Sequence, residues 1–378
     1  MKKFNLNAKE RISLLEMIET GRLSVGSKTD PEPKWCASLE KEMCDKFESK
    51  HAVLFNSGTS SIHAALSALG VNYCDEVISS PLTCYSAVLP IAMSGAVPIF
   101  ADVSEDTLSI DPKSFRKNIT DKTKAVLLPY IYGLPLPIKK FVSICRANEI
   151  ALIEDCAHVP ALKLGGKYAG TFGEISCFSF AQGKVLDCGE GGAALTNNPL
   201  LADEMRFFKD GGKRALRVYT PRGANNKMTN LEAFLAFKQV KNLEKNISAR
   251  AKIAKLYFSA CESTEGVSVN NKTTCLPSVA LFKSLSPARD LILKLREKGV
   301  DAKSIYKPLN ESNVFTENNL LEGFFNNDAK RAQIFRERNK PTPVANKASA
   351  HFFYIETDPM FSVSFHKQKA KEFRDSLR

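Results

Sequence analysis

The sequence lacks a hydrophobic run long enough to cross a membrane. Its longest apolar tract, residues 88–101, is interrupted by prolines and a glycine, and it is shorter than the roughly 20 residues that a spanning helix needs. The first ten residues, MKKFNLNAKE, are too polar for a secretory signal peptide. We therefore expect a cytoplasmic protein that does not insert into a membrane.

The sequence also lacks the paired cysteines that mark a zinc site. None of its ten cysteines forms a CxxC pair, and several, such as Cys145 and Cys177, lie inside apolar segments. A cysteine in such a segment behaves as a small hydrophobic residue. We expect a reduced protein without structural disulfides and without a bound metal.

A concentrated basic segment is missing as well. Lysine and arginine outnumber the acidic residues, 53 to 41, but they are spread along the whole chain, and no RNA-binding motif accompanies them. A nucleic-acid-binding protein is therefore the least favoured interpretation of the net charge of +12. A solvated basic surface is favoured, and such a surface can attract an anionic small molecule such as a nucleotide-linked metabolite.

Apolar runs alternate with helical patterns between residues 35 and 200. This alternation predicts an α/β fold with a mainly parallel sheet that helices cover on both faces. With 378 residues, the chain can form a large domain with an N-terminal segment, expected over residues 1–245, and a smaller C-terminal α/β domain, expected over residues 246–378. The predicted strands are Ala52–Phe55, Glu76–Ser79, Val97–Ala101, Lys124–Leu128, Ile150–Glu154, Ile175–Phe180 and Ala193–Thr196.

The pattern changes after about residue 230. Apolar residues predict one long, buried helix over Leu231–Ile247, a second helix over Leu291–Lys298 and a closing amphipathic helix over Phe365–Leu377. Residues 310–347 are rich in asparagine and proline, and we expect them to form loops over a binding site or a mobile flap.

Lys184 is the strongest candidate for a catalytic residue. It lies between a predicted strand that carries a serine and the turn GEGG, and Asp155 closes the preceding predicted strand. Pyridoxal phosphate needs an amine for a Schiff base, a carboxylate at its ring nitrogen, and hydroxyls or amides for its phosphate. We predict that Lys184 supplies the amine and moves a proton between substrate and cofactor carbons, and that Asp155 keeps the ring nitrogen protonated.

The segment NSGTSS joins the first predicted strand of the sheet to a predicted helix. Gly58 permits a tight turn, and the amides at a helix N-terminus favour an anion. Thr59 and Ser60 add hydroxyl donors, and Ser179 can add another from a neighbouring strand. Because the carboxyl ends of parallel strands meet at one edge of a sheet, we expect these residues to converge on the lysine and to bind the cofactor phosphate.

Two further residues lie close to these motifs. His158, three positions after Asp155, is placed to donate a hydrogen bond to the phenolic oxygen of the cofactor. Glu190 belongs to the GEGG turn, and we expect it to hold that turn by accepting amide hydrogens.

These motifs, taken together, resemble those of the DegT/DnrJ/EryC1/StrS aminotransferases, pyridoxal-phosphate enzymes that aminate nucleotide-activated keto sugars. The similarity runs in order along most of the chain and weakens over the last hundred residues. The segments that carry it are Ser57–Ser60, Asp75–Ile78, Pro81–Thr83, Gly95–Pro98, Tyr132–Gly133, Glu154–Ala157, Gly170–Gly173, Phe178–Lys184 and Gly189–Gly192.

The resemblance implies a fold-type-I transferase that acts as a homodimer with shared active sites. It implies that Lys184 forms the Schiff base, and that Asn225 reaches the cofactor phosphate from the partner subunit. It also implies L-glutamate as the amino donor and a nucleotide sugar as the acceptor, for the synthesis of surface glycans or amino sugars. Relatives that dehydrate a sugar carry histidine in place of the lysine, so Lys184 favours amination.

Three positions depart from the family pattern. Cys84 stands where an aromatic residue often stacks on the cofactor ring, and Tyr85 beside it is expected to point the other way. Lys227 replaces an arginine, and Asn310 replaces a histidine. Cys84 and Asn310 keep open the alternative of a non-catalytic regulatory protein that binds the cofactor. A pyridoxal-phosphate-dependent sugar dehydratase is the other alternative.

Overall fold

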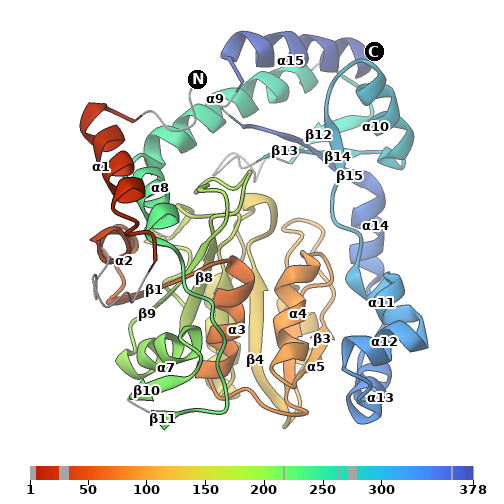
Figure 1. Ribbon diagram of the computed structural model, residues 1–378. Helices are drawn as coiled ribbons and strands as arrows, with labels where there is room; N and C mark the ends of the chain where they lie inside the picture. The colour runs from red at the N-terminus through yellow and green to blue at the C-terminus, as the bar shows by residue number, and fades with distance from the viewer. Residues whose placement is uncertain are drawn as a thin grey trace.

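The computed structural model has an α/β architecture with two main sheets, which confirms the predicted fold class (Figure 1). The larger sheet has seven strands, and they match the seven predicted strands to within one residue at each end. In spatial order they are β1 (His51–Phe55), β9 (Gly192–Thr196), β8 (Ile175–Ser179), β5 (Ala151–Asp155), β4 (Thr123–Pro129), β2 (Glu76–Ser79) and β3 (Val97–Phe100). The structure describes residues 6–24, 34–215, 218–262, 264–270, 279–358 and 361–377.

Pairing in the larger sheet is parallel from β8 to β3, and β9 runs antiparallel to both of its neighbours. Because β9 is reversed, it begins where β1 and β8 end, and Gly192 lies opposite both Phe55 and Ser179. The carboxyl ends of the other strands and the first residue of β9 therefore meet at one edge of the sheet. In open α/β sheets, ligands bind at this edge.

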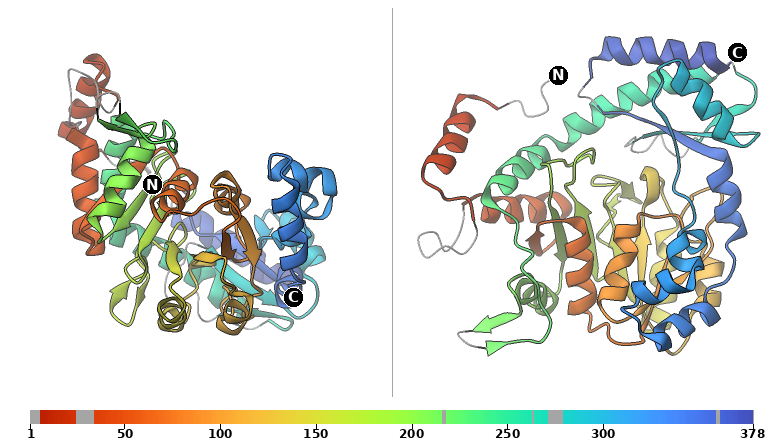
Figure 2. Two further views of the ribbon diagram at one scale, coloured as in Figure 1. Left: turned by 90° about the horizontal axis from the view of Figure 1, so that it is seen from below. Right: turned by 45° about the vertical axis from the view of Figure 1, so that its right-hand side comes forward.

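Helices cover both faces of the larger sheet, as the view from below shows (Figure 2). Right-handed crossovers that move along a sheet in opposite directions place their helices on opposite faces. The chain moves one way from β2 to β3 and the other way from β4 to β5, so α4 and α6 lie on opposite faces. The helices around this sheet are α2 (Lys34–Phe47), α3 (Gly58–Ala68), α4 (Tyr85–Met93), α5 (Pro112–Asn118), α6 (Ile138–Ala147) and α7 (Pro199–Lys209).

A four-stranded antiparallel sheet forms the smaller part of the molecule, at the top of Figure 1. Its core contains the rings of Phe282 and Phe353, which stack at 5.3 Å, and Phe373 of α15 packs against both. The helices α10 and α15 occur where they are predicted. The elements here are β12 (Val267–Val269), β13 (Val279–Ser284), α10 (Ala288–Glu297), β14 (Ala302–Ser304), β15 (Phe352–Glu356) and α15 (Val363–Leu377).

The prediction of one helix over Leu231–Ile247 is wrong, because the chain forms two helices there. α8 (Asn230–Lys241) ends and α9 (Leu243–Cys261) begins at Asn242. The Asn242 side-chain amide donates to the Lys238 carbonyl oxygen at 2.8 Å and so satisfies an acceptor at the end of α8. α9 then runs from the larger part of the molecule to the smaller sheet (Figure 1).

The prediction of loops over residues 310–347 is also wrong, since this segment is mostly helical. Pro343, for example, occupies the first turn of a helix, a position that proline favours. The rings of Phe315 and Phe335 pack against Phe100 of β3, so the segment joins the core of the larger sheet. Its elements are η3 (Leu309–Glu311), α11 (Asn313–Thr316), α12 (Asn318–Phe324), α13 (Ala329–Arg338) and α14 (Pro343–His351).

The same segment covers the outer edge of the larger sheet at β3. The Asn339 side chain accepts a hydrogen bond from the Phe100 amide at 2.7 Å and donates one to the Pro98 carbonyl oxygen at 3.0 Å. Arg338, its neighbour, forms an ion pair with Glu76 of β2, with 2.7 Å between Nε and Oε1. The asparagine thus makes hydrogen bonds that an additional strand would otherwise make.

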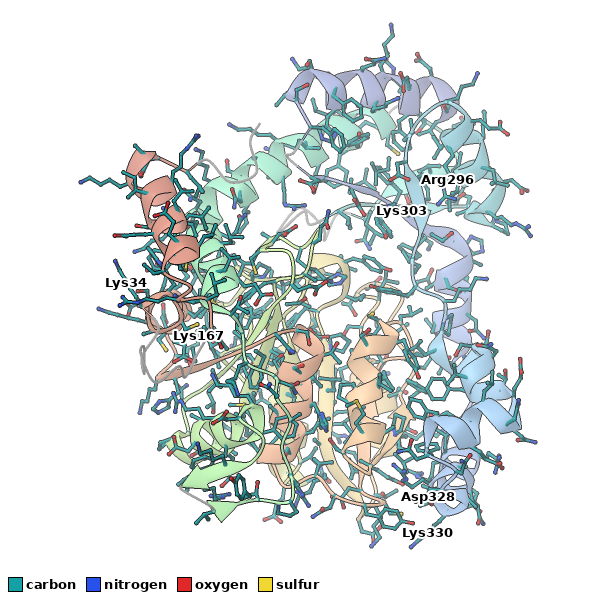
Figure 3. The ribbon with its side chains drawn as sticks, in the orientation of Figure 1. Lys34, Lys167, Arg296, Lys303, Asp328 and Lys330 are labelled. Atoms are coloured by element: carbon teal, nitrogen blue, oxygen red, sulfur yellow. The ribbon has the colours of Figure 1, made fainter. Side chains whose placement is uncertain are left out.

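The basic side chains labelled in Figure 3 lie on separate parts of the molecule: Lys34 and Lys167 on one side, Arg296 and Lys303 in the smaller part on α10 and β14, and Lys330 at the start of α13. Within the described ranges, no helix combines the length and the hydrophobicity needed to span a bilayer. The remaining elements are α1 (Ala8–Glu19), η1 (Ile131–Gly133), β6 (Lys163–Leu164), β7 (Lys167–Tyr168), β10 (Lys213–Ala215) and β11 (Val218–Tyr219).

Candidate active site

A cavity of about 240 Å³ lies at the carboxyl ends of β1, β5 and β8. Its walls come from the turn before α3, the segment after β5, the loop after β8 and the residues around the start of α4. Ser60 and Asn225, which were also predicted to contact the cofactor, are not among the residues that line it. The predicted site residues that do line it are Gly58, Thr59, Asp155, His158, Ser179 and Lys184.

Asp155 and Lys184 form the charged centre of this cavity. Burial raises the pKa of the Asp155 carboxyl, while the Ala157 amide, which donates to Oδ1 at 3.0 Å, and the Lys184 ammonium group oppose that rise. Burial lowers the pKa of the Lys184 amine, and the Asp155 carboxylate opposes that change. The lowered pKa increases the share of neutral amine, which is the nucleophilic form. A second cation beside Asp155 would stabilise its charge, by about 4 kcal/mol at 4 Å and an effective dielectric constant of 20.

His158 is held as a neutral hydrogen-bond donor. The Tyr132 amide donates to His158 Nδ1 at 3.2 Å, so in the neutral ring the proton resides on Nε2. Burial and the charge of Lys184 hold the pKa of His158 well below its usual range, which favours this neutral form. The tautomer therefore suits the predicted contact with a phenolic oxygen.

The N-terminus of α3 presents backbone amides at the cavity. Ser57 caps the helix by accepting a hydrogen bond from the Ser60 amide at 3.0 Å. None of the hydrogen bonds among described residues uses the amides of Gly58 or Thr59, so both are available to an anion. The Ser60 hydroxyl donates to Asn56 Oδ1 at 2.7 Å instead of lining the cavity.

Two glycines allow three segments to meet beside this helix end. A Cβ atom on Gly58 would lie 2.9 Å from the Ser179 Cβ, and a Cβ on Gly192 would lie 2.5 Å from the Ser57 carbonyl carbon. Such distances are below normal van der Waals contact, so only glycine fits at either position without a shift of the surrounding atoms. Gly192 was not predicted as a site residue, although the repeated glycines of the GEGG turn were a signal for it.

Glu154 is a second residue that sequence reasoning missed. It lies on the opposite face of β5 from Asp155, since successive side chains of a strand alternate. Its buried carboxylate accepts hydrogen bonds from the amides of Gly170, Phe172 and Gly173 at 2.7–2.8 Å and from the Tyr130 hydroxyl. It therefore fixes the loop after β7 to the strand that ends in Asp155.

The structure corrects the role predicted for Glu190. Its side chain is exposed and lines the cavity, and none of the hydrogen bonds among described residues joins its carboxylate to the turn. Asp187 accepts the turn's amide hydrogens instead, from Gly183 at 2.6 Å and from Gly189 at 3.0 Å.

The positions that depart from the family pattern lie as follows. Cys84 lines the cavity, whereas Tyr85 contacts Phe324, with 6.1 Å between ring centroids, and so points away from the cavity as expected. Lys227 forms an ion pair with Asp210 at 2.6 Å.

An aromatic pair stands next to Cys84. The Tyr306 amide donates to the Tyr132 hydroxyl at 2.7 Å, and the two rings stack at 5.8 Å. Burial raises the pKa of the Tyr306 hydroxyl, and neighbouring Cys84 adds to the rise. This contact joins the segment after β14 to the wall of the cavity.

One cavity at the ligand-binding edge of the sheet thus brings together four groups. They are the Lys184 amine, the Asp155 carboxylate, the neutral His158 ring and the N-terminus of α3. These groups are the ones that an aldehyde cofactor with a ring nitrogen and a phosphate requires. The fold and the site together define a pyridoxal-phosphate-dependent transferase.

Comparisons with known proteins agree with this class. The chain matches the DegT/DnrJ/EryC1/StrS aminotransferase family over residues 6–336. It is 32% identical over 285 residues to the GDP-perosamine synthase of Escherichia coli O157:H7, covering 74% of this chain and 78% of that protein. It is 34% identical over 257 residues to the GDP-perosamine synthase of Vibrio cholerae, covering 68% of each. The aminotransferase from Psychrobacter cryohalolentis shares the fold, with a TM-score of 0.84 at 22% identity, over 97% of this chain and 96% of that one.

The chain therefore belongs to the DegT/DnrJ/EryC1/StrS aminotransferase family. Its cofactor is pyridoxal 5'-phosphate, and the residues of the cavity fit that molecule. Two free amides at the start of α3 suit the phosphate, and the close approach of Gly58 to Ser179 leaves a hydroxyl beside them. The buried carboxylate of Asp155 suits a protonated ring nitrogen.

Proposed function

We propose that this protein transfers an amino group from L-glutamate to a keto sugar carried on a nucleoside diphosphate. The observation that carries this proposal is the half-buried Lys184 side chain in the cavity at the sheet edge, where it interacts with the buried carboxylate of Asp155. The relatives named GDP-perosamine synthase support a GDP-linked keto sugar as the first acceptor to test. The amino sugar would serve the synthesis of a surface polysaccharide.

Each side chain has a separate task in this reaction. When bound, the cofactor supplies an aldehyde and a ring that withdraws electrons from the reacting carbon. The amides of Gly58 and Thr59 would hold its phosphate, and Asp155 would hold the proton on the ring nitrogen. His158 would donate from Nε2 to the phenolic oxygen. Lys184 would carry a proton from the donor carbon of glutamate and later deliver one to the sugar carbon.

We further propose that the enzyme acts in the cytoplasm as a homodimer with shared active sites. Asn225 supports this proposal, because it pairs with Asp210 outside the cavity of its own chain, so contact with the phosphate would require a second subunit. The division into a large domain over residues 1–245 and a small domain over residues 246–378 stays a prediction.

Amination is favoured over the two alternatives. A sugar dehydratase of this family would carry histidine at position 184, where this chain has a lysine that lines the cavity. A non-catalytic regulatory protein would not need an amine whose pKa burial lowers toward the nucleophilic form.

The test is the visible absorbance of the purified protein with pyridoxal phosphate, before and after L-glutamate. We expect a yellow band that glutamate bleaches, and we expect Lys184→Ala to lack the normal band. Addition of a GDP-linked keto sugar should restore the band and yield an aminated product by mass spectrometry. A band that glutamate leaves unchanged would contradict the amino-transfer proposal, and a dehydrated product would favour the dehydratase.

A further inference from the structure

The loop that carries Lys184 is closed at its base. It connects β8 with β9, two neighbouring strands, and the main chain of residues 181 and 189 pairs in a bridge. The Gln182 amide also donates to the Gly189 carbonyl oxygen at 2.8 Å. Inside the loop the backbone turns sharply, since Gly183 has a φ of +90°. The position of the lysine amine therefore depends on what holds the interior of this loop.

Asp187 holds that interior from one side. Its side chain is 3% exposed, and its two carboxylate oxygens accept separate hydrogen bonds, from the Gly183 amide at 2.6 Å and from the Gly189 amide at 3.0 Å. The first of these amides precedes Lys184 directly. A carboxylate can accept at both oxygens, whereas an asparagine amide would turn one donor group toward another donor.

Arg250 is the second side chain that binds the main chain of this loop. This residue of α9 is 6% exposed, and its Nη2 donates to the Lys184 carbonyl oxygen at 3.4 Å. No described residue accepts a hydrogen bond from its Nε. Burial lowers the pKa of the guanidinium, and the charges of Asp358, Glu356 and Asp187 oppose this. Because Asp358 and Glu356 follow or end β15, Arg250 connects the smaller sheet electrostatically with the lysine loop.

We propose that Asp187 and Arg250 are positioning residues, which together clamp the main chain on both sides of Lys184 and so set the place of its amine. The clamp rests on the proposed function, because it matters only if that amine reacts with the cofactor. Neither side chain lines the cavity, so both act through Lys184 and not on substrate. A displacement of about 1 Å at a reacting group can cost on the order of 100-fold in rate.

The experiment compares Asp187→Asn with a matched control, Asp111→Ala. Asp111 also accepts a backbone amide hydrogen, from Lys113 at 2.6 Å, but it caps α5 outside the cavity. The rate at which cofactor-free protein gains visible absorbance with pyridoxal phosphate is measured across a pH series, together with the thermal midpoint. We expect Asp187→Asn to slow this gain by roughly 10-fold or more and to change its pH profile. Asp111→Ala should lower the thermal midpoint without changing the rate.

The possible outcomes separate the clamp from the proposed function. If the wild-type protein gains no absorbance, the proposed function fails. If the wild-type protein gains it and Asp187→Asn has the same rate and pH profile, Asp187 is merely structural and the clamp is overturned. If Asp187→Asn does not fold, Arg250→Lys decides the question, because it keeps the charge but shortens the reach toward the Lys184 carbonyl oxygen. An unchanged rate in that variant would overturn the clamp as well.

Discussion

Replacing Gly192 with alanine should displace the Ser57–Gly58 turn, which we propose to hold the cofactor phosphate. The added Cβ would lie 2.5 Å from the Ser57 carbonyl carbon and oxygen and 2.6 Å from the Gly58 nitrogen, and all three are backbone atoms. A shift of about 0.9 Å is needed to bring 2.5 Å up to 3.4 Å, where ordinary contact begins. Gly192 does not have a positive φ, so the effect is steric and not conformational.

The magnitude follows from this displacement. Overpacking of this kind costs about 1–3 kcal/mol of folding stability. We expect the dissociation constant for pyridoxal phosphate to rise about 10- to 100-fold, which corresponds to about 1.4–2.7 kcal/mol. The affinity is measured by titrating cofactor-free protein with pyridoxal phosphate, and the stability by urea unfolding of the same cofactor-free protein.

Gly323→Ala serves as the control, because a Cβ at that position in α12 meets no atom within 4 Å. Alanine should be tolerated there and should slightly favour the helix. If Gly192→Ala binds the cofactor as tightly as Gly323→Ala and unfolds at the same urea concentration, the close approach of β9 to the Ser57–Gly58 turn does not hold in solution. That result would refute the steric reasoning.

Asp155→Asn should lower the pKa of the Lys184 amine further, because the Asp155 carboxylate opposes the effect of burial. The rate of cofactor attachment should then reach half its maximum at a lower pH. An unchanged midpoint pH would contradict this prediction. His158→Phe removes a donor and should weaken cofactor binding about two- to tenfold, whereas His158→Gln should bind nearly as the wild type does in the same titration. Glu154→Ala leaves three backbone amides without their acceptor. It should reduce the free energy of unfolding, measured in urea, by more than about 3 kcal/mol. A smaller loss would mean that water replaces the carboxylate. Burial raises the pKa of Glu154, so the folded protein binds this proton more tightly than the unfolded chain, and the free energy of unfolding should fall as the pH rises from 4.5 through the raised pKa. Glu154→Gln should flatten that part of the profile, and an equal slope in both proteins would count against it.

The strands of the larger sheet were predictable because each is a continuous apolar run between polar turns. The meeting of Asp155 and Ser179 at one cavity was predictable because residues at the ends of parallel strands share one edge of the sheet. Lys184 was singled out by its setting between a strand that carries a serine and the GEGG turn. The helices between residues 313 and 351 were not predictable, because asparagine and proline are common both in loops and at helix ends. What decides between them is the contact of Phe315 and Phe335 with Phe100, and residues so far apart in the chain carry no local signal of that contact.

The residues missed at the site depend on distant contacts in the same way. Gly192 is required because the turn before α3, more than 100 positions earlier, passes directly over it. Glu190 and Asp187 are both acids near one turn, and only the folded backbone determines which of them accepts the amides. The Asn242 side chain ends α8 through a hydrogen bond to the Lys238 carbonyl oxygen. A single asparagine inside an apolar helical pattern is not enough to predict the end of a helix.

The hydrogen bonds of Asn339 to the outer edge of β3 affect how this protein could be divided or shortened. A chain that stops at residue 245 would keep every strand of the larger sheet but would lose the asparagine and the phenylalanines that cover Phe100. Its outermost strand would then present unpaired amide and carbonyl groups beside an exposed aromatic ring, a combination that invites strand-to-strand association between molecules. We therefore expect that the helices after residue 312, besides completing the core, protect the edge of the larger sheet from association with other molecules.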